Sequence, residues 1–419
     1  MINLGLKLQL SILFFLFYSF VVFAKDSQRV ESIHNQFIII KNTQSFDRQN
    51  EIITIDKKVL RNSNPKIFPI VKRKSQILIS QLSDSDNDGR WDKLLVEINL
   101  HSFQQDSLQI EWVAKDKLPI FNNATNIRFS YKSKTSEPTP EIEKLMRLRG
   151  FTQDISNPVF QMEGPGIEND KVAFRIFFDK RNSKDLYGKL TSKMILDKVG
   201  LVGSWHHLAD WGMDILHSGT SIGSGGLAVK EAGIVYPLAD ADSSFYNFVE
   251  EGPLKASFKL RFSNWDAGRQ KINGQELISI QKGDYFFKEK VVVRLNKNQK
   301  LVDGMPNFFA DTVVLKKLNK KYSSISTYSK QADGTKTYLG LAVMFPTKSF
   351  SKTGRMKTGD KLTDSFYVEL NPTKNELQTI YYFACWEMSD KRFSTVIGFN
   401  EYLQNTANRL ENPIKVQIK

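Results

Sequence analysis

The chain has 419 residues, of which 41% are hydrophobic, and a formal net charge of +14. This length allows one large domain or two ordinary ones, with enough apolar residues for a core. The single cysteine, Cys385, excludes a disulfide framework, and the absence of any nucleic-acid-binding motif argues against a nucleic-acid partner despite the basic charge.

The N-terminus has the pattern of a secretory signal. Lys7 precedes an almost wholly apolar run over 8–23, and Ala24 supplies a small residue before Lys25. The run is short for a membrane span and no second one follows, so we expect no membrane insertion. We therefore predict a signal peptide over 1–24, a polar leader over 25–35, and export to the periplasm or the extracellular space.

Short β-branched runs separated by turn residues follow, which is typical of strands. They predict an N-terminal β-meander region over residues 36–118, with runs such as QFIIIKN, RQNEIITI, KIFPIVKR, SQILISQL, KLLVEINL and SLQIEWVAK. A helix is expected over 138–149, because Pro140 suits an early helical position and Gly150 a stop.

Strand patterns then resume and predict one large antiparallel β-sandwich domain over residues 119–419. The closing stretch FSTVIGFNEYLQNTANRLENP predicts a C-terminal helix that ends at Asn412–Pro413. The runs that we assign to strands are NPVFQMEG, KVAFRIFFD, LKASFKLRF, QELISIQKG, KEKVVVRLN, YLGLAVMF, DSFYVELN and TIYYFACW.

An acidic loop lies between two of the N-terminal strands. Oxygen ligands at alternate positions around Gly89 resemble those of a calcium loop, although Leu95 stands where the terminal glutamate is expected. An Asx-rich hairpin turn explains the composition equally well. We predict a structural calcium ion with four ligands, Asp84, Asp86, Asp88 and Asp92.

An arginine within an apolar strand is the next candidate. In VAFRIFFD, alternation places Arg175 on the face of Ala173 and Phe177. A buried arginine needs a carboxylate partner, which is either a protein group such as Asp179 or a substrate. Two further candidates, Arg181 and Tyr187, follow in what we expect to be a more exposed turn.

The stretch WHHLADWGMDILHSGTSIGSGG holds three of the five histidines. As a helix, it places His206, Asp210 and His217 on one face; as a loop, it points His206 and His207 to opposite sides. A zinc site fits no standard spacing. Two interpretations stay open: one of the histidines is a general base oriented by Asp210 or Asp214, or the histidines and tryptophans simply pack under a loop. The glycine-rich tail predicts a tight turn.

The order of these motifs resembles the family called domain of unknown function 4861. The resemblance rests on DSDNDGRWDKLLVEI, ENDKVAFRIFFDKRN, DWGMDIL, SIGSGGLAV, YLGLAV and ANRLENPIKV, and it extends from about Gln36 to Ile418. It implies an exported bacterial protein linked to the degradation of acidic polysaccharides, with relatives that include a uronate-dehydrating activity. The fold that we expect is mainly β, with a large antiparallel β-sandwich of the galactose-mutarotase-like kind.

We therefore expect an enzyme that acts on uronate-containing oligosaccharides by β-elimination, as a dehydratase or a lyase, and that needs no cofactor. The basic charge suits an acidic oligosaccharide or polysaccharide partner, although scattered lysines also serve solubility. The alternatives are a glycoside hydrolase that pairs Asp210 with Asp214 and a non-catalytic glycan-binding protein. The catalytic candidates are His206, His207, Tyr187, Arg175 and Arg181, and the substrate-binding candidates are Trp205, Trp211, Asp210, Asp214 and His217.

Overall fold

The computed structural model describes residues 36–419, except 63, 155, 239–240, 357–360 and 375. The predicted signal peptide (1–24) and polar leader (25–35) lie outside the described residues. The described residues from Gln36 to Lys419 belong to one compact unit. None of the helices described in it has the length and apolar character to cross a membrane.

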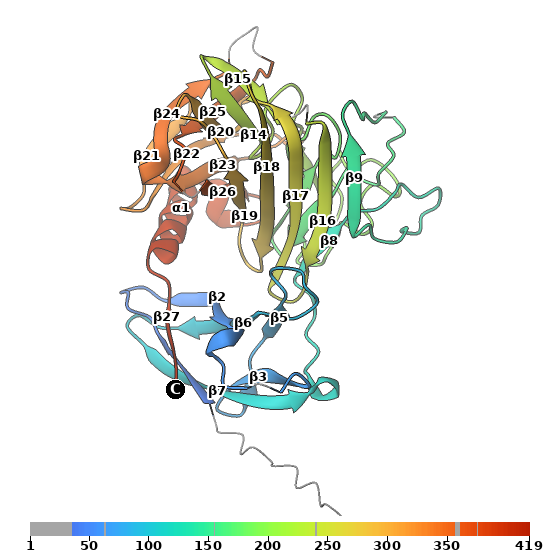
Figure 1. The fold of residues 1–419 in the computed structure, drawn as a ribbon. Coiled ribbons are helices and arrows are strands. Elements are labelled where there is room, and N and C mark those ends of the chain that lie inside the picture. The colour runs from blue at the N-terminus through green and yellow to red at the C-terminus, as the bar shows by residue number, and fades with distance from the viewer. Residues whose placement is uncertain (1–35, 63, 155, 239–240, 357–360, 375) are drawn as a thin grey trace, which may run out of the picture. The chain divides into compact units, whose positions relative to one another are not determined.

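The N-terminal strands form two sheets over a core of their own (Figure 1). The last strand of the chain pairs antiparallel with the first, so residues 415–418 complete an N-terminal sheet. The predicted division after residue 118 stays a prediction. In sheet order, the strands are β27 (Lys415–Ile418), β1 (Gln36–Lys41), β7 (Gln105–Ala114), β3 (Ile67–Arg73) and β4 (Gln76–Ile77), then β2 (Arg48–Asp56), β6 (Lys93–Leu100) and β5 (Ser80–Ser83).

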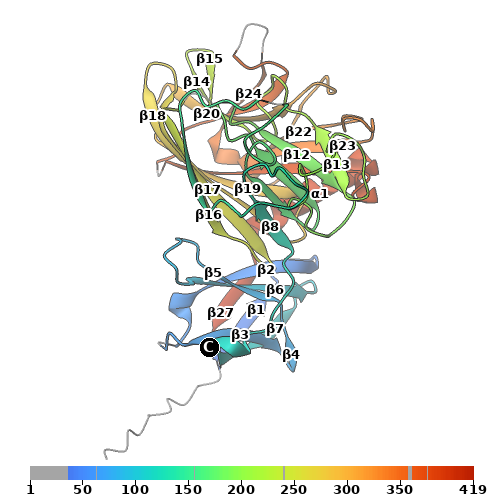
Figure 2. The ribbon, with the colours of Figure 1, turned by 90° about the vertical axis from the view of Figure 1, so that its right-hand side faces the viewer.

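The rest of the chain forms the large antiparallel sandwich that the sequence predicts. Figure 2 looks toward β12 and β13, at the end of one five-stranded sheet. This sheet contains β13 (Gly212–Leu216), β12 (Lys184–Lys189), β11 (Val172–Ile176), β10 (Gly166–Asn169) and β8 (Thr125–Arg128). A second contains β15 (Ile234–Pro237), β14 (Leu227–Glu231), β20 (Gln299–Pro306), β25 (Ser365–Leu370) and β24 (Phe350–Arg355).

A nine-stranded sheet is the other layer, and side chains of all three sheets share the main core. The rings of Phe174 and Phe287, for example, meet across the layers with centroids 4.8 Å apart. The strands of the nine-stranded sheet are β21 (Val314–Lys317), β22 (Tyr322–Ser329), β23 (Leu339–Pro346), β26 (Leu377–Trp386), β19 (Phe286–Val293), β18 (Lys271–Gln281), β17 (Lys255–Asp266), β16 (Ser243–Glu250) and β9 (Lys144–Leu148).

Strand β26 shows why this sheet needs a helix. Its alternate residues Tyr382 and Ala384 enter the sandwich core, whereas Phe383 and Cys385 enter a second core on the opposite face. Helix α1 (Val396–Glu411) covers that face, and its first turn is capped by a hydrogen bond from Gly398 N to Thr395 Oγ1. The predicted C-terminal helix is confirmed. The short 3₁₀ helices are η1 (Lys57–Val59), η2 (Lys115–Lys117), η3 (Thr347–Ser349) and η4 (Lys391–Ser394).

Two predicted elements are wrong. The segment 138–149 contains strand β9 in place of the predicted helix, because residues 144–148 pair antiparallel with β16. Tertiary pairing outweighs helix propensity here. The segment 157–164 forms turns with one isolated bridge, at Phe160, because it curves over the sandwich with Glu163 at a φ of 63°.

A buried ionic cluster lies inside the sandwich. The Nζ of Lys184 is 2.8 Å from Glu289 Oε1 and 3.3 Å from Glu276 Oε2, and all three side chains are at least 97% buried. Asp303 is fully buried nearby, and its carboxylate oxygens make no hydrogen bond to the described residues. Burial raises the pKa of Asp303 to about 7, although Lys184 acts in the opposite direction.

This cluster predicts a pH-dependent stability. Because the folded-state pKa of Asp303 exceeds that of the unfolded chain, its contribution is fully present near pH 3 and is lost as pH rises toward 7. Asp303→Asn stays neutral throughout and should therefore raise the free energy of unfolding at pH 8 by roughly 1–3 kcal/mol, with little effect near pH 4. Urea denaturation at both pH values measures this difference.

The exposed Asp311, substituted in the same way, is the matched control and should show no such pH dependence. If Asp303→Asn changes the free energy of unfolding equally at pH 4 and pH 8, the raised pKa of Asp303 is contradicted.

Candidate functional site

The register of three strands assembles the site. Arg175 of β11 lies directly opposite Asp185 of β12, and Tyr187 of β12 lies opposite Asp214 of β13. A bulge interrupts the second pairing, since Leu186 already pairs with Leu216. This irregularity allows Asp214 to join the face of Arg175 while Leu216 packs in the sandwich core.

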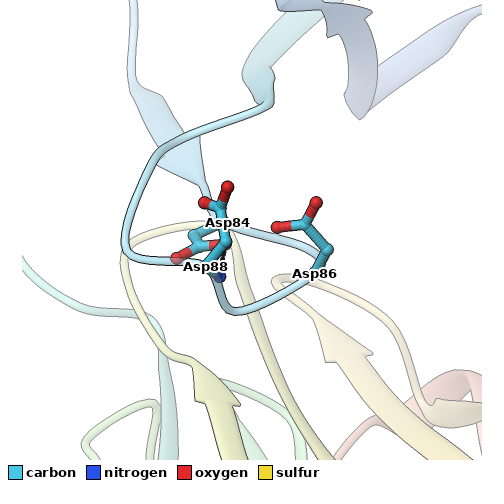
Figure 3. A group of neighbouring side chains, drawn as sticks. All are labelled: Asp84, Asp86 and Asp88. Atoms are coloured by element: carbon cyan, nitrogen blue, oxygen red, sulfur yellow. Dashed lines mark hydrogen bonds between the residues drawn. The ribbon is translucent and has the colours of Figure 1, made fainter.

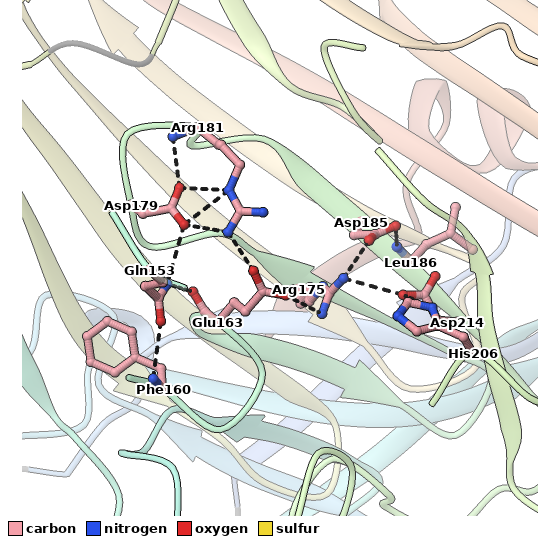
Figure 4. A network of polar contacts seen from close by, with 10 residues as sticks. All are labelled: Gln153, Phe160, Glu163, Arg175, Asp179, Arg181, Asp185, Leu186, His206 and Asp214. Atoms are coloured by element: carbon pink, nitrogen blue, oxygen red, sulfur yellow. Dashed lines mark hydrogen bonds and ion pairs between the residues drawn. The ribbon is translucent and has the colours of Figure 1, made fainter. Parts of the chain in front are cut away.

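Arg175 is the centre of a buried ionic network, shown in Figure 4. Its Nη2 is 2.8 Å from Asp185 Oδ2 and 3.3 Å from Asp214 Oδ2, and its Nη1 is 3.5 Å from Glu163 Oε1. The arginine side chain is only 3% exposed. The partners are therefore protein carboxyl groups, as in one of our two alternatives, but they do not include our example Asp179, because the hairpin register presents Asp185 instead.

One guanidinium faces three carboxyl groups in this network, so negative charge is in excess. Burial raises the pKa of Asp214 well above its usual range, and the adjacent Asp185 raises it further. Burial raises the pKa of Asp185 as well, against the pull of Arg175. These directions favour a carboxyl pair that retains a proton, as in other sites where two carboxyls share one location.

Arg181 extends the network toward the surface. Its guanidinium binds both carboxylate oxygens of Asp179, and its Nη2 is 2.5 Å from Glu163 Oε2. Glu163 thus connects Arg181 to Arg175, and both guanidinium groups lie over the ring of Phe177. With 31% of its side chain exposed, Arg181 reaches solvent, as we expect from its place in a turn.

Tyr187 contradicts the expectation of an exposed residue. It lies within β12 and is fully buried, with its ring 6.1 Å from that of Trp211. Burial raises the pKa of its hydroxyl, which forms no hydrogen bond with the described residues. Tyr187 therefore belongs to the inner wall of the site, behind the groups that solvent reaches.

The histidine segment is a loop and not a helix. Its backbone closes through reciprocal hydrogen bonds between Ala209 and Gly212, and β13 then begins. Gly212 has a φ of 124°, and a Cβ there would lie 1.8 Å from Gly188 O, so this position requires glycine. The helical alternative, which placed His206, Asp210 and His217 on one face, is therefore wrong.

His206 is the histidine that joins the network. Its Nδ1 is 3.6 Å from Asp214 Oδ2, while 55% of its side chain remains exposed. Partial burial lowers its pKa, and the charge of Arg175 lowers it further. A neutral imidazole backed by a carboxyl group is suited to accept a proton. His207 is exposed and makes no ion pair or side-chain hydrogen bond to the parts of the chain that the structure describes.

A second histidine lies close by. His217 follows β13, its Nδ1 contacts Asp333 Oδ2, and its ring stacks on Phe308 with centroids 5.3 Å apart. The charge of His217 is near enough to lower the pKa of His206, and Asp333 N donates a hydrogen bond to Ile215 O of β13. Two half-exposed imidazoles, each with a carboxyl group at Nδ1, thus lie in one region.

A cavity of about 710 Å³ lies beside Trp205, whose ring centroid is 5.6 Å from that of His206, although neither His206 nor His217 lines it. Trp205 lines it and also contacts the network, because the guanidinium of Arg175 lies 5.7 Å from the indole centre. Trp211 and Asp210 line the cavity as well, and their role in substrate binding stays a prediction. Two lysines, Lys193 and Lys198, also line it and form no ion pair among the described residues.

Buried polar contacts hold the cavity wall over residues 195–199. The carboxylate of Glu168 accepts hydrogen bonds from Ile195 N and Leu196 N and pairs with the buried Lys189. The side-chain amide of Gln161 donates to three backbone carbonyls of the same segment. The cavity is therefore largely preformed, as is typical of small-molecule sites.

Sequence reasoning missed Asp185, Glu163, Asp333 and Glu168. Only Asp185 has a usable signal: a hairpin centred on the turn residues DKRN pairs it with Arg175. Asp333 is contributed by a loop more than a hundred residues away from His217, and no local pattern connects the two.

The acidic loop lies apart, in the N-terminal region (Figure 3). Three of the four predicted calcium ligands, Asp84, Asp86 and Asp88, bring a carboxylate oxygen within 4.8 Å of one another. Asp92 does not join them, because its carboxylate accepts hydrogen bonds from Ser85 N and Oγ. Asp84 also accepts three backbone hydrogen bonds, as the alternative of an Asx turn requires. The calcium ion stays a prediction.

The chain is similar to several known proteins. A family model described as "Domain of unknown function (DUF4861)" matches residues 40–416. "Uncharacterized protein P7" of Formosa agariphila is 22% identical over 400 residues, which cover 92% of this chain and 94% of that protein.

Two solved structures from Enterococcus faecalis are also similar, each at 8% identity and over 92% of this chain. One is an alpha-mannosidase, which matches with a TM-score of 0.47 over 46% of its own length. The other is a protein in the glycosyl hydrolase family 38, which matches with a TM-score of 0.48 over 47% of its own length. The chain spans about half the length of either structure.

The acidic loop provides a test of the calcium prediction. Calcium should raise the melting temperature of the wild type, and the double substitution of Asp86 and Asp88 by asparagine should abolish this increase, because it removes two anionic ligands. Differential scanning fluorimetry with calcium and with a chelator measures the effect. Equal melting of the wild type under both conditions would reject the ion and leave the Asx turn.

Proposed function

The chain belongs to the family described as domain of unknown function (DUF4861), and we propose that it is an exported, carbohydrate-active enzyme that cleaves a C–O bond of a uronate-containing oligosaccharide by β-elimination. The observation that carries the proposal is the pair of half-exposed histidines, His206 and His217, each with a carboxyl oxygen near Nδ1, which lies 3.6 Å away at His206 and in direct contact at His217.

β-Elimination requires a base and an acid. The base removes the C5 proton of the uronate, the electron pair forms the C4–C5 double bond, and the C4–O bond breaks with a proton delivered to the departing oxygen. When that oxygen is a hydroxyl, water leaves; when it joins two sugars, the chain is cleaved. A single general base or acid typically accelerates such a reaction by ~10²–10⁴-fold.

We assign the base to His206 and the acid to His217. The lowered pKa of His206 keeps it neutral at pH 7, and the contact with Asp214 leaves its Nε2 for substrate. Asp333 holds His217 in the same way. Tyr187 is not assigned as the acid, because it is fully buried.

The substrate carboxylate needs a cation as charge develops on it. Lys193 and Lys198 of the cavity are better suited to this role than Arg175, whose guanidinium is buried among protein carboxyl groups. Arg175 and Arg181 are therefore positioning residues in this proposal. Trp205 and Trp211 supply apolar faces on which a sugar ring stacks.

The hydrolase alternative required Asp210 and Asp214 as paired carboxyl groups. Asp210 is exposed at the cavity, whereas only 1% of the Asp214 side chain is exposed, behind His206. This difference favours elimination over hydrolysis by that pair. Incubation with defined uronate oligosaccharides distinguishes the reactions: elimination gives ultraviolet absorbance from the unsaturated product, hydrolysis gives reducing ends without it, and a binding protein gives no product.

We predict that His206→Ala lowers kcat by at least about 100-fold, because it removes the general base. The melting temperature should change little, since a half-exposed side chain contributes roughly 1 kcal/mol or less to stability. The rate of absorbance increase at saturating substrate measures kcat.

His207→Ala is the matched control, because this neighbour is exposed and makes no side-chain hydrogen bond to the described residues. It should retain near-wild-type activity. The opposite result, in which only His207→Ala is inactive, would remove His206 from the mechanism.

The pH profile gives an independent test. A base must be unprotonated, so kcat should fall as the pH drops through the pKa of His206, which lies below the usual value of 6.5. Arg175→Met should move this limb to higher pH, because the charge of Arg175 helps to lower that pKa. If Arg175→Met is folded and the acidic limb of its kcat–pH profile is unchanged, the assignment of His206 as the base is contradicted.

A further inference from the structure

A second cleft lies between the three-stranded sheet of β2, β6 and β5 and the nine-stranded sheet. Its volume is about 220 Å³, and it shares no lining residue with the cavity at Trp205. The cleft is rich in cationic side chains, which are Lys93, Lys255, Lys282, Lys288, Lys290 and Arg409.

Half of these cations are neutralised by the protein. Lys255 pairs with Glu250 at 2.6 Å, and Lys282 pairs with Glu97 at 2.9 Å. The third pair joins Arg409 to Asp284 at 3.2 Å.

The other three, Lys93, Lys288 and Lys290, form no ion pair with any residue that the structure describes. Among the described residues, the only carboxylates that line the cleft are Glu51 and Asp284, and both are within 4.0 Å of Arg409. Lys93 is near enough to Asp92 to lower the pKa of that carboxyl group, whereas Lys288 and Lys290 have no carboxylate partner among the described residues.

The fold, and not chance exposure, brings these three lysines together. Lys288 and Lys290 are two residues apart on β19, so both point to the cleft side of the sheet. Lys93 begins β6, in the facing sheet. Lys288 is partly buried, and its Nζ lies 5.9 Å from the ring centre of Tyr381.

The electrostatics agree with this geometry. Burial, together with the charges of Lys290, Lys255 and Lys93, lowers the pKa of Lys288 to about 8. Burial and the charges of Lys93 and Lys255 also lower the pKa of Lys290. Like charges that repel one another in a partly desolvated cleft are stabilised by an anion placed between them.

We propose that the cleft at Lys93, Lys288 and Lys290 binds a compact oxyanion of the sulfate or phosphate class. Several ammonium groups around one small anion supply charge-assisted hydrogen bonds from different directions. The small volume of the cleft suits a single anionic group, either free in solution or carried as an ester on a sugar. This site is independent of the proposed elimination.

The test uses sodium sulfate and the mature chain at constant ionic strength, balanced with sodium chloride. The melting temperature of the wild type should rise saturably with millimolar sulfate, since a ligand that binds only the folded state stabilises it. Lys288→Met should melt higher than the wild type in chloride, because repulsion is relieved. Its dissociation constant for sulfate should be about tenfold higher than that of the wild type.

The control variant is Lys320→Met, which removes an exposed lysine outside the cleft and changes the net charge equally. It should keep the wild-type response to sulfate. Lys290→Gln, at an exposed position of the cleft, is a second test variant should Lys288→Met fail to fold. A sulfate response that is unsaturable and equal in all four proteins would overturn the proposal, because general salting-out would explain it.

The source of the anion is resolved by comparing inorganic sulfate and phosphate with a sulfated monosaccharide and its unsulfated parent. Tighter binding of the sulfated sugar than of free sulfate, lost in Lys288→Met, assigns the cleft to a sugar ester. Equal or weaker binding assigns it to the free anion. Elimination activity that persists in Lys288→Met keeps this site separate from the histidine site.

Discussion

The need to compensate the buried charge of Arg175 governs the structure of the site. A guanidinium that is 97% buried is tolerated only when carboxyl groups surround it, and here they come from three separate segments of the chain. Glu163 precedes β10, Asp185 is on β12, and Asp214 is on β13. The same contacts that neutralise Arg175 fix the strand register, and Asp214 then holds His206 at the solvent boundary.

Strand β12 connects this network to the sandwich interior. Lys184 and Asp185 are neighbours in sequence, so their side chains point to opposite faces of the sheet. Lys184 binds Glu289 in the interior, whereas Asp185 binds Arg175 on the other face. Two buried ionic clusters therefore share one strand, and both contain carboxyl groups with raised pKa values, exemplified by Asp303 and Asp214.

The sequence predicts the mainly β class, most of the longer strands and the C-terminal helix, because β-branched runs and the stop at Asn412–Pro413 are local signals. It fails at 138–149, where helix propensity loses to pairing with β16. It also misses β12 and β13, whose charged and glycine residues conceal a strand pattern. At the site, it selects His206, Arg175 and Asp214 but does not identify Asp185 as the partner of the arginine.

By itself, the sequence determined the family, the β-rich class and the set of residues that carry reactive groups. Composition, periodicity and motif order are properties of neighbouring residues, and they survive without coordinates. Only the tertiary structure decided that His206 and not His207 faces a carboxyl group, that Asp333 reaches His217, and that three lysines share one cleft. These pairings join segments that are distant in the chain, and a bulge of one residue in β12–β13 is enough to change them.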